Sequence, residues 1–512
     1  MEAVGRSQTC QYQTFLLAVT IAERLNLNSS SDAMNQNVLI VGAGPVGLTL
    51  AIELVRYGVA ARIVEKATQR TDKSKALVLW SRTLELLDRQ PGGSAPFVEA
   101  GFKVDAVSIL AGKKQIGRVS MEAVDSPYPY ALMLPQSETE RLLEERLNAL
   151  GIRVERDVEV TAISLRADGA EAILRHADGR EEKAVADWLA GCDGAHSLVR
   201  HTVGAAFAGE TMDSDWMLAD VHMRGYPVPD TEATVYWHTD GAFVIFPISP
   251  GRYRLLADLP PSGAAHPPAP SLEQVQAMIE RRGPPGMTAY DPIWLAGFRI
   301  NGRKVASYRY GRAFLCGDAA HVHSPAGGQG MNTGMQDAFN LAWKLAAAAK
   351  GFCHERLLDS YSAERSEVGE HVLKDAQNLT VAGTVKNPVA QAIRNTVGHL
   401  MLGLAPVQHA MADKMSEMSV GYPKSPLNGQ ALSGGPKPGA RIAPIAGQTP
   451  VGSGTSPRFA LFATSSPAAA GLIERFSPCS IRASVRRSDR MDYGWRGPTV
   501  TLLARPRAET RQ

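Results

Sequence analysis

The feature that most constrains this chain is a glycine-rich turn between a buried strand and an amphipathic helix. Residues 38–41, VLIV, form a continuous apolar run, as expected of a parallel strand covered on both faces. Gly42, Gly44 and Gly47 follow with G-x-G-x-x-G spacing, and apolar residues then recur at helical spacing over residues 48–55. This unit predicts an α/β fold around a parallel sheet.

The same unit has the residues that a dinucleotide site requires. Gly42 allows the tight turn, Gly44 lets the backbone approach a pyrophosphate, and Gly47 lets the helix pack closely on the strand. A second strand, residues 60–64, ends at Glu65, whose carboxylate can accept from ribose hydroxyls. The predicted binding residues are Gly42, Ala43, Gly44, Pro45, Gly47, Glu65 and Lys66. The alternative is a purely structural turn, and the unit by itself does not separate NAD from FAD.

A second strand–turn–helix segment lies at residues 186–204, ADWLAGCDGAHSLVRHTVG. Its turn contains Asp193, and Ser197 and Arg200 follow. Asp193 and Arg200 are seven residues apart, so two helical turns can place them on one side. The simpler alternative is a capped helix start held by an ion pair between them, since Asp and Ser are favoured at N-caps.

A third segment of this kind begins with the strand 313–316 and continues through Asp318 into a glycine loop. The loop contains Pro325, Gly327, Gly328 and Gly330, and the next helix has an apolar face. Such a loop can direct several backbone N–H groups onto one ligand, and the helix N-terminus favours electron-rich groups. A carboxylate at the strand end can hold a ribityl or ribose hydroxyl.

The three segments, in this order and at these separations, resemble the group A flavoprotein monooxygenases, the family of para-hydroxybenzoate hydroxylase and phenol hydroxylase. The most specific stretch is GDAAHVHSPAGGQGMNTGMQDAFNLAWKLA, residues 317–346. The resemblance implies an α/β chain with a Rossmann-like FAD-binding domain and an inserted mixed β-sheet substrate domain. Beyond about residue 425 the chain looks like the degenerate thioredoxin-like lobe of the phenol hydroxylase and aromatic polyketide hydroxylase branches.

This resemblance divides the chain into consecutive segments. Residues 1–35 would be an N-terminal extension outside the fold, with Met34 as an alternative start. The FAD-binding domain would take residues 36–205 and, with a helical region, 301–422; residues 206–300 would form the substrate-binding sheet. Residues 423–512 would be a Pro/Gly-rich linker and the thioredoxin-like lobe, with strands at 459–463 and 481–485 and a helix near 468–476.

The resemblance also assigns roles residue by residue. The first glycine turn would hold the FAD pyrophosphate, Glu65 the adenosine ribose and Asp318 the ribityl chain. Asp193 and Arg200 would be the D-G motif that the family associates with both FAD and NAD(P)H.

Further positions would surround the flavin ring. The residues assigned to the loop beside the isoalloxazine and the oxygen site are Pro325, Gly327, Gly328, Gly330, Met331 and Asn332. Gln136 would lie on the flavin side. Lys75 stands where family members usually have Arg, and Lys lacks the guanidinium fork, so its phosphate contact is expected to be weaker.

The substrate lobe contains three expected strands, at residues 235–238, 243–247 and 253–257, joined by Asp-Gly and Pro-Gly turns. In the family, the equivalent sheet forms the floor of the substrate pocket. Tyr236, Trp237 and His238 are therefore candidates to face the substrate. An ordinary sheet face is the alternative for each of them.

Composition excludes several other classes. A net charge of +3 gives no electrostatic case for nucleic acid, and no apolar run reaches the roughly 18 residues of a membrane span. His321 and His323 form an H-x-H without further ligands, so no metal site is predicted. Five scattered cysteines favour a reducing, cytoplasmic location. A homodimer is left open.

The resulting hypothesis is an FAD-dependent monooxygenase that consumes NADPH or NADH and hydroxylates a phenolic small molecule through a C4a-hydroperoxyflavin. One alternative is a hydroxylase or Baeyer–Villiger-type oxygenase that acts on a large polyketide or antibiotic. The other is a non-oxygenating FAD protein.

Overall fold

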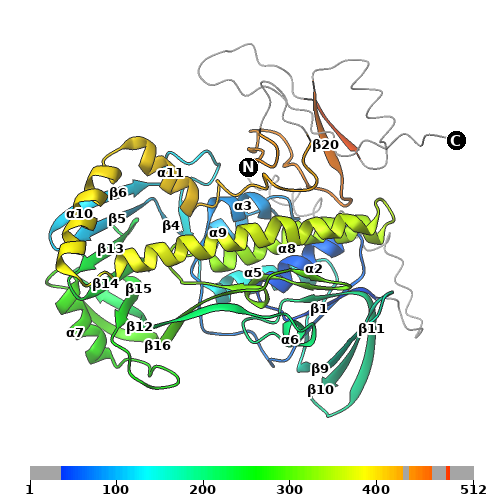
Figure 1. The fold of residues 1–512 in the computed structure, drawn as a ribbon, viewed down its shortest axis with the longest axis horizontal. Coiled ribbons are helices and arrows are strands. Elements are labelled where there is room, and N and C mark those ends of the chain that lie inside the picture. Colours follow the sequence, from blue (N-terminus) through cyan, green and yellow to red (C-terminus); the bar gives the residue numbers. More distant parts are fainter. Residues whose placement is uncertain (1–35, 430–436, 464–479, 485–512) are drawn as a thin grey trace, which may run out of the picture.

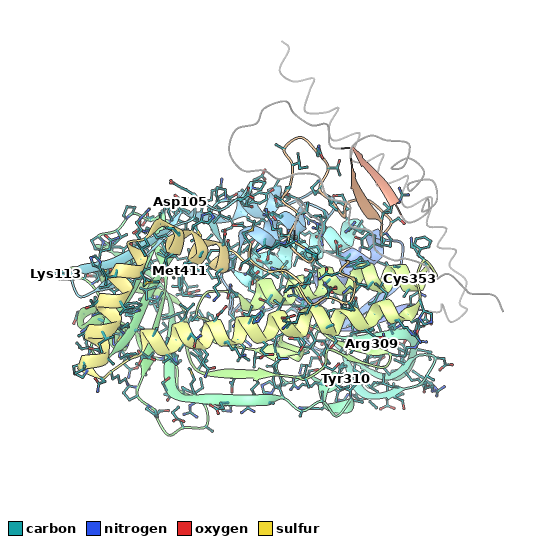
Figure 2. The ribbon with its side chains drawn as sticks, turned by 45° about the horizontal axis from the view of Figure 1, so that its top comes forward. Asp105, Lys113, Arg309, Tyr310, Cys353 and Met411 are labelled. Atoms are coloured by element: carbon teal, nitrogen blue, oxygen red, sulfur yellow. The ribbon has the colours of Figure 1, made fainter. Side chains whose placement is uncertain are left out.

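The computed structural model describes residues 36–429, 437–463 and 480–484, which form a mixed α/β fold (Figure 1). Two eight-stranded sheets lie toward opposite ends, and the long helices α8 (Gly330–Ala349) and α9 (Asp359–Gly383) run between them. Figure 2 shows this elongation: Lys113, from the second sheet, lies at one end, whereas Arg309 and Tyr310, from the first, lie toward the other. Within the described ranges, no helix is both long and apolar enough to cross a membrane.

The first sheet has a parallel centre. Its parallel strands are β18 (Ala313–Leu315), β11 (Glu181–Gly191), β1 (Gln36–Val41), β2 (Ala61–Glu65) and β8 (Glu155–Arg156), in that spatial order. Three antiparallel strands extend it: β9 (Val158–Leu165), β10 (Ala170–His176) and β17 (Arg309–Tyr310). Val38 and Ile40 are fully buried, as their apolar run predicts, and α2 (Pro45–Arg56) makes the crossover from β1 to β2. The predicted strand–turn–helix–strand unit is confirmed.

The second sheet confirms the three predicted strands, as β13 (Glu232–His238), β14 (Gly241–Ser249) and β15 (Arg252–Leu259). Its other strands are β5 (Ala106–Ala111), β6 (Lys114–Ser120), β12 (Ala208–Arg224), β16 (Thr288–Lys304) and β19 (His321–Val322). The sheet therefore extends beyond residues 206–300. β5 pairs in parallel with β13, and β19 pairs antiparallel with β16, so the sheet recruits strands from both segments assigned to the FAD-binding domain.

Helices pack against this sheet from both faces. α7 (Leu272–Arg282) packs on one face through Val275 and Ile279. α10 (Pro388–Leu402) and α11 (Ala405–Met415) lie beside β6. The remaining elements are β3 (Val78–Leu79), β4 (Phe102–Val104), β7 (Ala131–Met133), α3 (Ser81–Leu87), α4 (Ala95–Ala100), α5 (Gln136–Ala149) and α6 (Leu198–Thr202), and the three strands form a small antiparallel sheet.

The predicted strands of the C-terminal segment are present as β20 (Phe459–Ala463) and β21 (Ser480–Ser484), which pair in parallel. The helix expected near residues 468–476 and the extension at residues 1–35 lie outside the described residues, and a thioredoxin-like lobe stays a prediction. The linker before β20 is tied to the first domain, since the Arg56 guanidinium donates to the carbonyls of Gly452 (2.9 Å) and Gly454 (2.6 Å).

Candidate active site

The first glycine turn shows three different steric situations at its three glycines. Gly42 has φ +100°, and a Cβ there would lie 2.4 Å from the carbonyl oxygen of Cys192. A Cβ at Gly47 would lie 2.0 Å from the carbonyl oxygen of Gly42. A Cβ at Gly44 would meet no heavy atom within 4 Å. The turn thus leaves open space on the side of Gly44 and at the start of α2, where a pyrophosphate can approach the backbone.

Glu65 lies at the end of β2 and faces this turn. Its Oε2 accepts from the backbone N–H of Ala43 (2.9 Å) and its Oε1 from that of Ala67 (3.0 Å). Its side chain is only partly buried, so the carboxylate keeps acceptor capacity for ribose hydroxyls. Lys66, the next residue, is exposed.

Asp193 and Arg200 do not form the ion pair that the simpler alternative requires. Asp193 accepts from the backbone N–H of Val199 (3.2 Å), whereas Arg200 donates to the carbonyls of Ala195 (2.7 Å) and Ala319 (3.2 Å). Arg200 therefore joins the second segment to the Gly-Asp turn of the third.

Asp193 and Arg200 each have a polar side-chain atom that makes no hydrogen bond. Oδ1 of Asp193 and Nε of Arg200 are buried without a hydrogen-bond partner. Burial raises the pKa of Asp193 and lowers the pKa of Arg200. Orphaned buried polar groups are rare in folded proteins, and a bound ligand is one way in which they are satisfied.

Asp318 lies in a tight turn directly after β18. Gly317 has φ +59°, and a Cβ there would lie 2.8 Å from Cγ2 of Val46 in α2, so the turn presses against the first glycine unit. The Asp318 side chain is exposed, yet desolvation by the surrounding protein raises its pKa, with nearby His321 and Lys75 opposing the shift. A carboxylate that is accessible to solvent but partly shielded by surrounding protein is expected in a concave part of the surface.

The glycine loop, residues 325–329, is held by Trp80, from a distant part of the chain, and by Asn332, in the first turn of α8. The Trp80 indole N–H donates to the carbonyl of Gly327 (3.0 Å). Asn332 accepts from the Trp80 backbone N–H (2.9 Å) and donates to the carbonyls of Gly328 (3.0 Å) and Val78 (2.8 Å). Pro325 is exposed at the start of the loop.

Two positions assigned to the cofactor have buried side chains. Asn332 is fully buried and its amide is engaged by the backbone, and the Met331 side chain packs in the core of the FAD-binding domain. Only their backbone groups, at the start of α8, are left for a cofactor. Gly330 stands at that helix start, where N–H groups lack intrahelical partners.

Gln136 and Lys75 lie in one hydrogen-bonded region, Gln136 through its side chain and Lys75 through its backbone carbonyl. The Gln136 amide accepts from the backbone N–H of Ala76 (3.1 Å) and donates to Glu140 (2.9 Å). Arg254 of β15 donates to the carbonyl of Lys75 (2.9 Å) and pairs with Asp220 of β12 (2.7 Å). Sequence reasoning missed this buried ion pair, because charged residues within a strand pattern predict solvent exposure.

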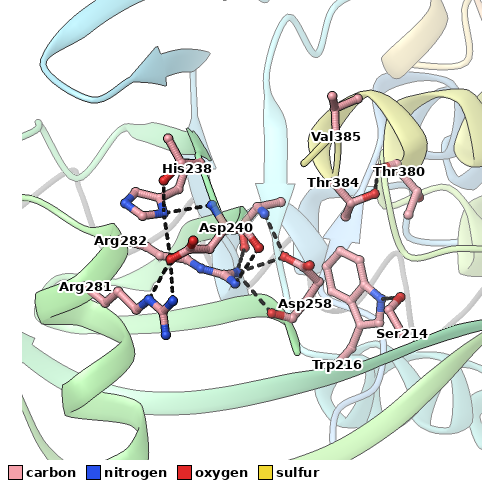
Figure 3. A network of polar contacts seen from close by, with 12 residues as sticks. Ser214, Trp216, His238, Asp240, Asp258, Arg281, Arg282, Thr380, Thr384 and Val385 are labelled. Atoms are coloured by element: carbon pink, nitrogen blue, oxygen red, sulfur yellow. Dashed lines mark hydrogen bonds and ion pairs between the residues drawn. The ribbon is translucent and has the colours of Figure 1, made fainter. Parts of the chain in front are cut away.

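The structure corrects the two substrate-pocket candidates. The Tyr236 ring packs in the core between the sheet and Val275 and Ile279 of α7. His238, two residues along the same strand, faces the same side and lies 3.5 Å from Asp240 (Figure 3). Side chains alternate along a strand, and Arg254 reaches Lys75 from the opposite face, so both candidates match the ordinary sheet-face alternative.

Trp237 faces the other way but is covered by α10. Its ring lies 4.5 Å from the guanidinium carbon of Arg394, and a Cβ at Gly398 would lie 3.3 Å from Cζ3 of the ring. This side chain fixes α10 on the sheet. None of the three aromatic candidates on this strand is therefore placed as a pocket residue.

A different aromatic cluster occupies the inner face. Trp216 of β12, only 6% exposed, packs with Ala242, Ile300 and Phe298, and a Cβ at Gly383 of α9 would lie 3.4 Å from Cβ of Ala242. Figure 3 shows a buried ion pair beside this cluster. Arg282 donates to Asp258 (2.8 Å), which also accepts from the Ala242 N–H (2.7 Å). Phe298 begins FRINGR, residues 298–303, a further stretch that resembles the family, whereas no sequence motif marked Trp216.

The two histidines of the H-x-H pair have protein partners. His321 Nε2 lies 2.8 Å from Asp337, which also accepts from Arg365 (2.6 Å). His323 Nδ1 lies 2.8 Å from the carbonyl of Ser324, and burial lowers its pKa to about 4. In the ranges that the structure describes, no group of three or more His, Cys, Asp or Glu side chains is placed to hold a metal ion.

Comparison with known proteins identifies the family. The sequence model of an FAD binding domain matches residues 35–376. The 6-methylpretetramide 4-monooxygenase of Streptomyces rimosus is 37% identical over 405 residues, covering 77% of this chain and 72% of that protein. The chain belongs to the FAD-dependent aromatic monooxygenases.

Other members of this family are similar over comparable lengths. The rifampicin monooxygenase of Streptomyces venezuelae is 35% identical over 390 residues, 75% of this chain and 79% of that protein. Among solved structures, the OxyS anhydrotetracycline hydroxylase from Streptomyces rimosus matches with a TM-score of 0.71 and 28% identity, covering 88% of this chain and 90% of that one. The monooxygenase therefore uses FAD, and the open cradle at Gly44 fits this cofactor.

Proposed function

We propose that this monooxygenase uses NAD(P)H and O2 to hydroxylate a phenolic ring held between the glycine loop and the inner face of the second sheet. One observation carries the proposal. β19, which leads from the Asp318 turn into the glycine loop, is itself the edge strand of the substrate sheet, with Arg303 opposite Val322 and Lys304 opposite His321. This pairing thus fixes the position of the glycine loop relative to the second sheet.

Bound FAD would supply the redox chemistry and the activation of oxygen. The chain's own residues would bind and orient the cofactor. The Gly44 backbone and the N-terminus of α2 would hold the pyrophosphate, Glu65 the ribose and Asp318 the ribityl hydroxyls. The backbone of the glycine loop would lie against the flavin ring, and Asp193 and Arg200 would complete the site from the second segment.

The inner face of the sheet would exclude water from the reacting centre. Trp216, Phe298 and Ile300 form an apolar cluster there, and the buried Arg282–Asp258 pair fixes the strand ends beside it. Excluding water would protect the activated oxygen from non-productive loss. The charged side chains of this face named above, Arg254 with Asp220 and Arg282 with Asp258, already neutralise each other, which favours a neutral phenol.

The relatives favour a large substrate over a simple phenol. Those compared above are named for a pretetramide, a rifamycin-type antibiotic and an anhydrotetracycline. We therefore infer that the phenolic ring belongs to a polycyclic aromatic compound. A monocyclic phenol is the second candidate and would use the same loop and wall.

The test is a panel of monocyclic to tetracyclic phenols with FAD-loaded protein, assayed separately with NADH and NADPH. We expect slow NAD(P)H oxidation without substrate, a large increase with polycyclic phenols, and one oxygen atom from 18O2 in the product. Asp318→Ala should weaken FAD retention and lower turnover together. Label from water, or flavin reduction that no aromatic compound alters, would contradict the proposal and favour a non-oxygenating FAD protein.

A further inference from the structure

Glu417 occupies a backbone conformation that disfavours its residue type. It follows α11 and has φ +60°, in the left-handed region where a Cβ is strained and Gly is preferred. Its side chain is nevertheless only 1% exposed. Strain of this kind persists where surrounding contacts over-determine it, often beside functional sites. The contacts of this carboxyl group therefore indicate which nearby structure keeps Glu417 in its strained conformation.

Both carboxyl oxygens of Glu417 contact the first two turns of α8. Oε1 accepts from the Thr333 hydroxyl (2.9 Å), and Oε2 accepts from the Gln336 amide. α8 begins at Gly330, directly after the glycine loop. The carboxyl group thus holds the helix on which the loop ends.

The residues before Glu417 contact the loop from another side. The Gln329 amide, at the last position of the loop, donates to the carbonyl of Lys414 (2.8 Å). The backbone N–H of Arg82 donates to the carbonyl of Ser416 (3.2 Å), and Arg82 is two residues beyond Trp80, whose indole holds Gly327. Residues 414–417 therefore contact the last residue of the loop and also the chain segment whose Trp80 holds Gly327.

The charges around Glu417 leave it without a cation of its own. Arg365 of α9, the nearest cation, donates to the carbonyl of Thr333 (3.0 Å) and is paired with Asp337 of α8 (2.6 Å). Burial raises the pKa of Glu417 to about 8, against the hydrogen bonds from Thr333 and Gln336 and the charge of Arg365. At neutral pH the group acts mainly as a neutral hydrogen-bonding carboxyl.

We propose that Glu417 is a positioning residue for the flavin: by holding Thr333 and Gln336 it fixes the first turns of α8 and, through them, the glycine loop. It does not touch the reacting atoms. The inference rests on the proposed role of this loop beside the flavin ring. A fixed loop would keep the ring in one position while oxygen reacts, so that loosening it would divert NAD(P)H oxidation from product to peroxide.

Glu417→Gly removes the carboxyl group and relieves the backbone strain, whereas Glu417→Gln retains a neutral hydrogen-bonding group. Asp291→Gly is the matched control, because Asp291 also has φ +45° but is exposed on the substrate sheet. The first readout is hydrogen exchange of residues 325–336 in the apoprotein. We expect roughly tenfold faster exchange there in Glu417→Gly, about 1.4 kcal/mol, near-normal exchange in Glu417→Gln, and no change in Asp291→Gly.

The second readout, with FAD bound, is product formed per NAD(P)H consumed. Glu417→Gly should lower this ratio severalfold with little effect on substrate KM, and Glu417→Gln should restore it. Unchanged exchange at residues 325–336 in Glu417→Gly would overturn the inference whatever the activity. If hydrogen exchange at residues 325–336 rises in Glu417→Gly but the parent protein oxygenates no aromatic compound, the positioning role of Glu417 stands and the proposed function fails.

Discussion

The two glycine turns that we assign to the cofactor are held in different ways. The first, Gly42 to Gly47, is fixed by its own backbone and by the neighbouring parallel strand, since Gly47 packs on the carbonyl of Gly42 and Gly42 on that of Cys192. The second, residues 325–329, is held by Trp80, Asn332 and residues 414–417. The first turn is rigid because of steric contacts with its own backbone and the adjacent strand. The second turn can be loosened by substitutions outside residues 325–329, at the side chains that hold it.

The strongest test of this contrast is Gly47→Ala. The added Cβ would lie 2.0 Å from the backbone oxygen of Gly42, so strand and helix must separate. We expect a loss of about 3 kcal/mol or more in unfolding free energy, measured by urea denaturation. Gly302→Ala is the control, since its Cβ would meet only one atom, at 3.9 Å, and should change stability by less than about 0.5 kcal/mol. Equal effects would contradict the close-packing argument.

Gly44→Val separates folding from cofactor binding within the same turn. Gly44 has φ −72° and ψ −176°, which any residue adopts, and its Cβ direction is open. The apoprotein should therefore fold normally, while the side chain occupies the pyrophosphate position and weakens FAD binding by about 100-fold or more. FAD titration followed by fluorescence, with urea denaturation in parallel, checks both parts. Retained FAD affinity would show that the pyrophosphate lies elsewhere.

Asn332→Ala should affect the second turn more than its own helix. It removes two buried hydrogen bonds and one part-buried one, which the Trp80 N–H and the carbonyls of Val78 and Gly328 make with Asn332, a cost of about 2 kcal/mol. We expect weaker FAD retention and faster exchange at the loop, with the first turn unchanged. Asn301→Ala removes one exposed hydrogen bond with Thr211. It should leave FAD retention and hydrogen exchange at both turns near the parent values.

The smallest expected effect is a pH dependence at the second turn. The pKa of Glu417 is raised from an ordinary 4.5 to about 8, so the folded protein keeps a proton that the unfolded chain releases between these values. Folding stability contributed by this group must therefore fall as pH rises through that window, by on the order of 1 kcal/mol between pH 7 and 8. Glu417→Gln should lack this part of the slope in paired urea titrations. Parallel profiles would refute the assignment.

Local rules explain what could be predicted. The first turn depends on glycine sterics, strand burial and a helix start, which all lie within residues 38–65. The hairpin strands β13 to β15 follow from alternation and turn residues, and their bounds agree with the expected ones to within three residues. The order of the three motifs and the resemblance that they carry then point to FAD, in agreement with the family match.

Other features required contacts between distant segments. The pattern of β13 could not show that Tyr236 faces α7 rather than the substrate, because alternation gives two faces without saying which one is inside. Recruitment of β5 into the second sheet joins residues more than a hundred positions apart, and β19 returns to this sheet only after the chain has passed through β18 of the first. The roles of Asn332, Arg254 and Glu417 likewise depend on partners that their own neighbours in sequence do not reveal.

The sequence by itself therefore determined the glycine turn that we propose for the FAD pyrophosphate, because the contact of Gly47 with Gly42 and the helix start are set within one strand, one turn and one helix. The tertiary structure alone decided which face of the substrate sheet is inside and what holds the second glycine loop. Those features depend on hydrogen bonds and packing between segments far apart in the chain, and no local spacing encodes such contacts.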